Sequence, residues 1–419
     1  MSGSARETHP QHGVPLVVVA PDSLKGSCTA PDAARAIASG VRRALGQGVR
    51  VRELPLADGG EGTLDALVAA WGGTVLEVAT TDALGRPRTG RVGLSGGRKG
   101  TRLAVIEAAD ANGLPAIVDQ PLRPLDADTA GVGTLVRAAL DTGAAEILLC
   151  LGGSATSDGG AGMLRALGAR LLDASGSDVA PGARGLSELH EIDLSGLDAR
   201  AGKVVWRVAC DVDHLLTGGG GAAAVFGPQK GATPEQVAVI DRGLSVLLRL
   251  LAEAAGYDLS ELRCLPGLGA AGGLALGPVA LFGAQLVPGS ALVSDAVGLP
   301  DALERAALVI TAEGRLDAQS LQGKVVSRVL ADAGAHRGGA HAAAGAVPSA
   351  VHSAVPSAVP VVVLAGSVEL TFEECQRAGI AAAWSIARGP ATLEQLQADT
   401  PRLLAEAAAH LTRLTLGKR

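Results

Sequence analysis

The sequence has little of what nucleic-acid-binding and membrane-spanning proteins use. Aromatic residues make up only 2% of its 419 residues, and the formal net charge is −6. The chain therefore offers neither the basic surface nor the stacking aromatics of nucleic-acid binders. Apolar runs such as residues 16–20 and 360–365 fall far below the roughly 18 residues of a transmembrane helix. We expect neither nucleic acid nor membrane as a partner.

Close pairs of cysteines are absent as well. The five cysteines are odd in number and widely scattered, which is typical of ordinary reduced thiols rather than a disulfide or metal framework. Residues 1–13 are polar and lack the apolar segment of a secretory signal. We interpret them as a disordered leader and predict a cytoplasmic protein.

Glycine, in contrast, is abundant. The 58 glycines are about twice the average usage, and they occur in clusters rather than in a repeat. Such clusters are typical of loops that approach a phosphate group closely. The apolar content of 47% can fill more than one hydrophobic core in a chain of this length.

Strand and helix patterns alternate along most of the chain. Strands are predicted over residues 16–20, 49–54, 146–151, 203–209, 307–312 and 360–364, with helices between them, for example over 31–45, 234–255 and 324–333. This alternation predicts a parallel sheet covered by helices. Residues 74–108 resemble three strands with tight turns, an antiparallel insertion, and the Ala/Pro/Ser-rich residues 336–360 indicate a surface insertion without a catalytic role.

Familiar nucleotide-binding fingerprints are weak or missing. No Walker A sequence is present, because Gly323-Lys324-Val325 lacks the upstream glycine and the Ser/Thr that would bind Mg²⁺. Gly267, Gly269 and Gly272 match a dinucleotide-binding glycine pattern, but the preceding segment is a poor strand. A kinase with this sequence is therefore not a P-loop kinase.

Several loops combine glycine with fixed charge at the carboxyl end of a predicted strand, where open α/β sheets bind ligands. The loop after the first strand holds Lys25, which can bind a phosphate or carboxylate oxygen next to a helix N-terminus. The loop after the second strand carries Asp58 and Glu61, which fit either helix capping or a polar ligand or Mg²⁺. Residues 152–160 have the small side chains of an anion-binding loop.

Two further strand ends carry paired charges. Asp211 and Asp213 share one face if the chain stays extended, and either can bind Mg²⁺ or act as a base, although a solvated turn is about as good an interpretation. At the end of a later strand, Arg315 and Lys324 can neutralise phosphate while Glu313 or Asp317 orients them. A plain surface ion-pair cluster is the alternative there.

Taken together, these motifs resemble the glycerate kinase family that is unrelated to P-loop kinases. The likeness runs from about residue 16 to 387, and it includes residues 20–27, 57–63, 152–163, 211–213, 225–231, 267–273 and 313–317. Leu24, His214 and Ala312 depart from the residues usual in the family, without loss of a charged motif residue.

The resemblance implies a two-domain α/β enzyme that uses ATP and Mg²⁺ to phosphorylate D-glycerate, with 2-phosphoglycerate the expected product. It implies a Rossmann-like parallel-sheet domain, which we place at residues 1–75 and 285–419, and a large inserted α/β domain at 76–284, with the active site in the cleft between them. Phosphoryl transfer asks a protein mainly to position anions and neutralise charge.

The expected site residues follow from this comparison. Lys25, Asp211 and Arg315 are the expected catalytic residues, and Asp58, Asp211 and Asp213 are the expected metal ligands. The expected substrate- and ATP-binding residues are Asp22, Ser23, Ser27, Asp58, Glu61, Gly152, Gly153, Ser154, Asp158, Glu313, Asp317 and Lys324. Two rival functions remain: a dinucleotide-dependent oxidoreductase and a non-catalytic protein that binds small organic acids.

Overall fold

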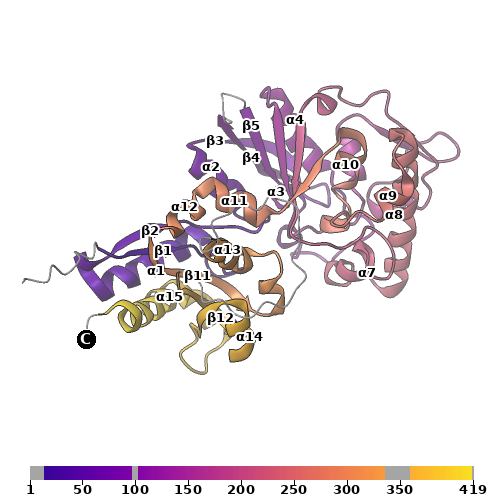
Figure 1. Ribbon diagram of the computed structural model, residues 1–419. Coiled ribbons are helices and arrows are strands. Elements are labelled where there is room, and N and C mark those ends of the chain that lie inside the picture. The colour runs from indigo at the N-terminus through magenta and orange to yellow at the C-terminus, as the bar shows by residue number, and fades with distance from the viewer. Residues whose placement is uncertain (1–13, 97–101, 336–358, 418–419) are drawn as a thin grey trace, which may run out of the picture. The chain divides into compact units, whose positions relative to one another are not determined.

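The computed structural model describes residues 14–96, 102–335 and 359–417 of the chain. It contains two compact units: unit 1 combines Met1–Leu56 with Gly298–Arg419, and unit 2 is Ala57–Val297. The indigo N-terminal and yellow C-terminal segments thus belong to the same unit (Figure 1). The predicted arrangement of a discontinuous α/β unit and an inserted α/β unit is what the structure has.

The borders between the units differ from those expected from the sequence. They lie after Leu56 and after Val297, whereas the sequence suggested residues 75 and 284. The cause is packing: α2 (Thr63–Trp71) contacts both β4 (Pro87–Gly96) and α11 (Gly289–Val297), and all three elements belong to unit 2. Sequence patterns locate elements but do not show which core an element joins.

Unit 1 is built on a five-stranded parallel sheet. Its strands are β1 (Leu16–Val19), β2 (Arg50–Glu53), β11 (Ala306–Leu316), β12 (Val361–Val368) and β13 (Ile380–Ser385), in the order β13-β12-β11-β1-β2. Counted within the unit, this is the doubly wound order 2-1-3-4-5. In such sheets ligands bind at the point where the strand order reverses, here between the carboxyl ends of β1 and β11.

Helices cover both faces of this sheet, so its strands are apolar on both sides. Val362 and Leu364 pack into one core with α1 (Ala30–Leu45) and α15 (Leu393–Leu416), while Val363 and Ala365 face the other core with α13 (Val325–Ala335) and α14 (Phe372–Ala378). Helix α1 begins at Ala30, where the Thr29 hydroxyl accepts a hydrogen bond from the amide of Asp32. Helix α15, which contacts α1 (Figure 1), was not foreseen.

Unit 2 contains a six-stranded mixed sheet in the order β10-β9-β6-β5-β4-β3. The strands β5 (Arg102–Glu107), β6 (Glu146–Cys150), β9 (Val205–Ala209) and β10 (Gln285–Val287) are parallel, and β3 (Thr74–Thr81), β4 and β5 pair antiparallel. The predicted antiparallel insertion is therefore one edge of the main sheet. A short hairpin of β7 (Arg170–Leu172) and β8 (Glu191–Asp193) lies outside it.

One large core holds unit 2 together, and it includes Trp206, which stacks on Phe282. The long helix α8 (Pro234–Ala255) has the predicted bounds, since Thr233 and Gln236 form a capping box at its start and Gly256 ends it with a φ of 64°. The other helices of the unit are α3 (Ala109–Asn112), α4 (Ala130–Asp141), α5 (Ala161–Ala166), α6 (Gly182–Leu186), α7 (Ala222–Phe226), α9 (Leu259–Arg263) and α10 (Leu276–Phe282). Helix α12 (Leu299–Leu303) belongs to unit 1.

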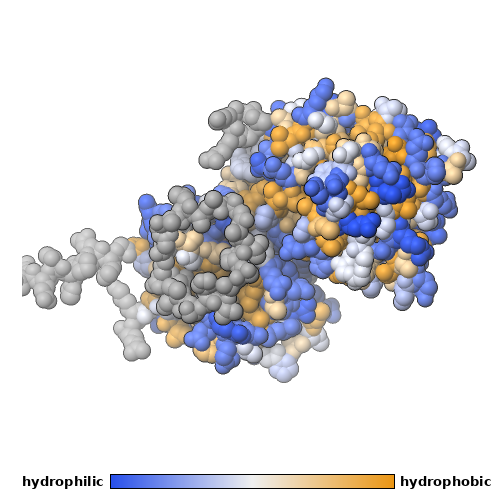
Figure 2. Space-filling view, turned by 45° about the vertical axis from the view of Figure 1, so that its right-hand side comes forward, coloured by the Kyte–Doolittle hydropathy of each residue, from blue (hydrophilic) through white to orange (hydrophobic). Residues whose placement is uncertain are grey.

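The surface is mixed in character. Hydrophilic and hydrophobic residues are interspersed on the face shown in Figure 2. Within the described residues, every helix is too short or too polar to cross a membrane. The predicted surface insertion at residues 336–360 lies outside the described residues except for its last two positions.

Candidate active site

In unit 2 the glycine-rich loop after β2 lies across the carboxyl ends of the parallel strands. A Cβ added to Gly59 would lie 2.9 Å from Cα of Gly289 and 3.2 Å from Cβ of Ala209. A Cβ on Gly152 would lie 2.9 Å from Cα of Gly60. The loops that follow β2, β6 and β10 therefore meet backbone to backbone, and glycine is needed where they touch.

Asp211 lies at the centre of this meeting point. Its two carboxylate oxygens accept hydrogen bonds from the amides of Gly289 (2.7 Å) and Ser290 (3.2 Å), which begin α11. Burial raises the pKa of Asp211 to about 7, with the Asp58 carboxylate adding to the rise and the two amides opposing it. A carboxyl group with such a pKa can hold or release a proton near neutral pH, which is typical of functional sites.

The three expected metal ligands are not equivalent. Asp58 is half-buried and close enough to Asp211 to affect its pKa, and its own Oδ1 accepts the amide of Gly60 at 3.2 Å. Asp213 is exposed and has no hydrogen bond or ion pair within the described part of the chain, while Val212 packs against the core. Over the same residues no group of three or more His, Cys, Asp or Glu side chains could hold a metal ion.

The pair of Asp58 and Asp211 nonetheless fits Mg²⁺ that arrives with a nucleotide. Mg²⁺ is usually held by one or two carboxylates together with substrate phosphates, and it keeps several waters, so a three-carboxylate cage is not required. Two neighbouring carboxylates also repel one another until a cation or a proton lies between them. The donor set therefore suits a cation that brings its own phosphate ligands.

The loop after β6 offers donors for an anion. The amides of Gly152, Gly153 and Ser154 have no hydrogen-bond partner within residues 14–96, 102–335 and 359–417. On its other side the loop is fixed to the segment after β5, because Leu114 donates its amide to Gly153 O (2.7 Å) and Ala155 donates to Asn112 O (2.8 Å). Consecutive free amides on a rigid loop form a typical anion-binding concavity.

Lys230 contacts this loop from another segment of the chain. It was not singled out as a site residue from the sequence. Its side chain is 3% exposed, and its Nζ donates to Ser154 Oγ (3.1 Å) and to Thr156 O (2.5 Å). The only signal was its place in the motif at residues 225–231. A lone lysine in a sequence gives no sign that it will be buried.

Asp158, expected to bind substrate, is used inside the protein. Its carboxylate is fully buried and accepts hydrogen bonds from the amide and hydroxyl of Thr129 (3.0 and 2.8 Å) and from the amides of Gly160 and Gly162 (3.2 and 3.0 Å). This arrangement ties the loop to α4 and α5. It favours a structural role.

Asp58 and Glu61 do not cap α2, and a different glutamate binds its first turn. Helix α2 begins without a side-chain cap, and Glu61 is exposed. Instead, the amide of Leu64 donates to Oε1 of Glu107 (2.7 Å), a residue only 3% exposed at the end of β5. Burial raises the pKa of Glu107 to about 7. Sequence reasoning missed Glu107 because it ends an apolar strand.

In unit 1 the loop after β1 lies at the point where the strand order reverses. The amide of Asp22 donates to Ala312 O (2.9 Å), which joins this loop to β11. Lys25 is exposed and has no partner within the described residues, whereas Oδ1 of Asp22 accepts the amide of Ser23 (2.6 Å). Ser23 and Ser27 are half-buried beside it. Lys25 is thus available to a ligand at the carboxyl ends of β1 and β11.

Strand β11 continues four residues beyond the end predicted from the sequence, so Glu313 and Arg315 lie within it, on one face. Glu313 is 8% exposed, and its Oε1 is buried without a hydrogen-bond partner in the described chain. Burial raises its pKa to about 7, with the Ser320 hydroxyl and Lys324 opposing the rise. This oxygen can accept a hydrogen bond from a ligand or from water.

The other predicted residues of this segment have different partners. Arg315 is exposed and pairs with Asp317 (3.3 Å) and with Glu369 (3.6 Å). Asp317 caps the turn Ala318–Leu321 by accepting the amides of Gln319 and Ser320, and Lys324 is half-buried close to Glu313. Asp317 therefore organises the turn, while Lys324 lies near the Glu313 carboxyl group.

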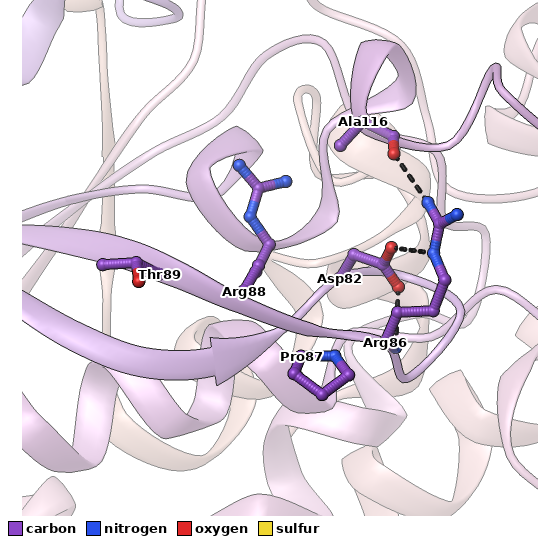
Figure 3. A pocket seen from close by; sticks show the side chains of 6 residues that line it. All are labelled: Asp82, Arg86, Pro87, Arg88, Thr89 and Ala116. Carbon is purple, nitrogen blue, oxygen red and sulfur yellow. Dashed lines mark hydrogen bonds and ion pairs between the residues drawn. The ribbon is translucent and has the colours of Figure 1, made fainter.

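A further pocket of about 490 Å³ lies beside the β3–β4 turn, lined by Asp82, Arg86, Pro87, Arg88, Thr89 and Ala116 (Figure 3). Arg86 is already satisfied there: it donates to Asp82 (2.5 Å), to Asp119 (2.7 and 3.1 Å) and to Ala116 O (2.7 Å). This network pins the turn to the segment after β5. The pocket holds none of the predicted site residues.

The glycine pattern at 267–272 does not form a dinucleotide site. It follows α9 instead of a strand, and a 3₁₀ turn, Ala270–Gly272, comes next. A dinucleotide fingerprint needs a strand before the glycines and a helix after them. Gly269 and Gly272 serve packing, since an added Cβ would lie 2.3 Å from Leu215 O and 2.1 Å from Thr156 O.

Comparison with known proteins agrees with the ordered motifs. The sequence profile described as "Glycerate kinase family" matches residues 17–354 and 339–416. The chain belongs to the glycerate kinase family. It is 42% identical to a glycerate kinase of Bacillus subtilis (strain 168) over 90% of this chain and 92% of that protein. It is 42% identical to the glycerate 2-kinase of Escherichia coli (strain K12) over 74% and 79% of the two chains.

A solved structure of the same family also matches. A crystal structure assigned as glycerate kinase 2 from Salmonella typhimurium LT2 is 39% identical, has a TM-score of 0.76, and the match covers 96% of this chain and 98% of that one. The glycerate kinase family, predicted from the motifs, is thereby confirmed. The TM-score shows that this relative shares the mixed α/β fold described above.

Proposed function

We propose that this chain transfers the γ-phosphoryl group of ATP to the 2-hydroxyl of D-glycerate, giving 2-phosphoglycerate. The observation that carries the proposal is the half-buried Asp211 carboxyl, held by two amides next to Asp58 and the free amides after β6, in a chain of the glycerate kinase family. The 2-position is supported by the name of the E. coli relative. We also propose that the protein acts in the cytoplasm.

Unit 2 supplies groups that bind the phosphates in this proposal. The amides of Gly152, Gly153 and Ser154 donate to phosphate oxygens, and Asp58 and Asp211 hold Mg²⁺. When bound, Mg²⁺ neutralises and orients the phosphate oxygens. Asp211 is preorganised for this task because the amides of α11 fix its carboxylate before any ligand arrives.

Unit 1 supplies the charges and the acceptor for glycerate. Lys25, Arg315 and Lys324 neutralise the glycerate carboxylate and the transferred phosphoryl group. The unpaired Oε1 of Glu313 accepts a hydrogen bond from a glycerate hydroxyl, which satisfies the buried oxygen. That both sets act on the same reactants, in a cleft between the units, stays a prediction.

The rival functions are separable by experiment. We expect ADP release in a coupled assay that depends on both D-glycerate and a divalent cation, with L-glycerate as the control acceptor. Phosphorus NMR of the product then distinguishes the 2-phosphate from the 3-phosphate. Binding of glycerate without ADP release would support an organic-acid-binding protein, and turnover unaffected by excess EDTA would contradict the role of Mg²⁺.

A further inference from the structure

The Lys230–Ser154 contact is a feature that the proposed chemistry does not explain by itself. Lys230 lies just after α7 and is 3% exposed, and Ser154 is 6% exposed in the loop after β6. Burying an ammonium group is costly unless it is paired and hydrogen-bonded. Burial lowers the pKa of Lys230 to about 8, with the Asp158 carboxylate opposing the fall, so the group is still largely an ammonium ion at neutral pH.

The donors and acceptors available to Lys230 and Ser154 determine which of the two donates the hydrogen bond. An ammonium group has three donors and no acceptor, so Ser154 Oγ must accept from Nζ at 3.1 Å. A serine hydroxyl carries a single hydrogen, which therefore points to some other acceptor. The described residues supply none for it. The Ser154 hydroxyl is thus left as a donor, and a hydroxyl whose oxygen accepts from a cation donates more strongly.

The same lysine holds the backbone of the loop. Nζ also donates to Thr156 O at 2.5 Å, two residues after Ser154. Together with the bonds to Asn112 and Leu114 on the other side, this contact fixes the loop from two directions. The amides of residues 152–154 and the Ser154 hydroxyl then form one group of donors that needs no rearrangement when an anion binds.

We propose that Lys230 is a positioning residue for the reaction: it directs the Ser154 hydroxyl and the amides of residues 152–154 at one anionic oxygen of a substrate. The oxygen belongs to a phosphate of the nucleotide, in line with the proposed function, and the carboxylate of the acceptor is the other source that the test distinguishes. The kinetic assay of this inference rests on the proposed function. The inference adds to that function a residue, Lys230, that does not touch the substrate itself.

The test is a double-mutant cycle of S154A and K230M, with KM measured separately for ATP and for glycerate. We expect each single substitution to raise the KM of the same substrate about tenfold, the usual cost of one hydrogen bond to a charged group. Because Lys230 positions the Ser154 hydroxyl as well as the loop amides, the double variant should be no worse than K230M alone. The substrate whose KM rises identifies the source of the oxygen.

Controls separate this role from general structural support. K203M removes an exposed lysine of the same unit, and S245A removes a hydroxyl of α8; both should leave the kinetic constants unchanged. If K230M does not fold, K230Q carries the test, since its amide keeps a donor for Ser154 Oγ and should restore much of the affinity. Independent, multiplying effects of S154A and K230M, or a loss of melting temperature with unchanged KM, would overturn the inference.

A second readout does not depend on glycerate turnover. Millimolar inorganic phosphate should raise the melting temperature of the wild-type chain more than that of S154A or K230M. If the wild type has no kinase activity, the proposed function fails, and the phosphate comparison still decides the inference. Equal shifts in all three proteins would overturn it.

Discussion

The two units present opposite chemistry at the carboxyl ends of their parallel strands. Unit 1 offers two exposed cations, Lys25 and Arg315, and one buried acid, Glu313. Unit 2 offers buried or half-buried acids and free amides, and the side chain of Lys230 points into the protein. Exposed cations neutralise charge at little folding cost, whereas buried acids must be held by amides and glycine contacts. The difference predicts that substitutions in unit 1 change mainly activity, and substitutions in unit 2 also change stability.

The largest effect is expected for D211N. Asparagine keeps the shape of Asp211 but loses the charge, so kcat should fall about a hundredfold or more, a typical cost of removing one preorganised electrostatic group. The apparent affinity for Mg²⁺, from a titration of ADP release, should fall as well. The matched control is D213N, which removes an exposed carboxylate two residues away and should change both values little. Equal effects of the two substitutions would contradict the assignment.

In unit 1, K25A should lower turnover about a hundredfold while the melting temperature stays unchanged, because an exposed side chain contributes little to folding. The matched control is R50A, an exposed arginine at the start of β2, the opposite edge of the sheet. A K25A enzyme with nearly wild-type kcat would show that Lys25 is only a solvated surface residue.

In unit 2, G289A tests the backbone contact between the loops. The new Cβ would lie 2.3 Å from Cα of Gly59, so one loop must move, and we expect a loss of about 1–3 kcal/mol in the free energy of unfolding. The control G202A has no atom within 4 Å of its added Cβ and should be neutral. Denaturant unfolding measures both. Wild-type stability of G289A would mean that the loops are not in contact.

The effect expected for E107Q is confined to one part of the pH range. The pKa of Glu107 is raised from 4.5 to about 7, so its stabilising contribution is complete below about pH 4.5 and is lost as the pH rises through 7. Glutamine keeps the acceptor for the Leu64 amide without the charge. The variant should therefore be more stable than the wild type at pH 8, by on the order of 2 kcal/mol, and similar at pH 4.5. Thermal unfolding at the two pH values measures this.

The exposed control for that comparison is E304Q, which should behave like the wild type at both pH values. A difference between E107Q and the wild type that does not change with pH would indicate a packing effect rather than a titration. That result would also weaken the contrast between the two units.

Much of the fold was predictable because helix caps and residue periodicity are visible in short stretches of sequence. Helix α8 has its predicted bounds since Thr233 and Gln236 form a capping box and Gly256 ends it. Helix α1 begins at Ala30 because Thr29 caps it. The long helix α15 was missed, although Thr392 and Gln395 give it a capping box as well. Pro401 inside it interrupts the pattern that a helix is expected to show.

The candidate site was only partly predictable. Lys25, Asp58, Asp211 and Glu313 were recognisable because they follow apolar strands within glycine-rich or charged segments. Lys230 and Glu107 were not singled out, since their importance comes from being buried, and burial of a charged side chain depends on contacts with residues far away in the sequence. Asp158 was expected to bind substrate because sequence cannot show that Thr129, Gly160 and Gly162 already occupy its oxygens.

By itself the sequence determined the alternation of strands and helices, the ordered motifs of the family and the loops that carry charge, because capping, periodicity and glycine clusters are local properties. Only the tertiary structure decided which unit α2 joins, that Asp211 is held by α11 while Asp213 faces solvent, and that Lys230 reaches Ser154. The physical reason is that desolvation and hydrogen-bond partners depend on which segments meet in space. These contacts set the pKa and the role of a charged side chain, and residue type alone does not determine either.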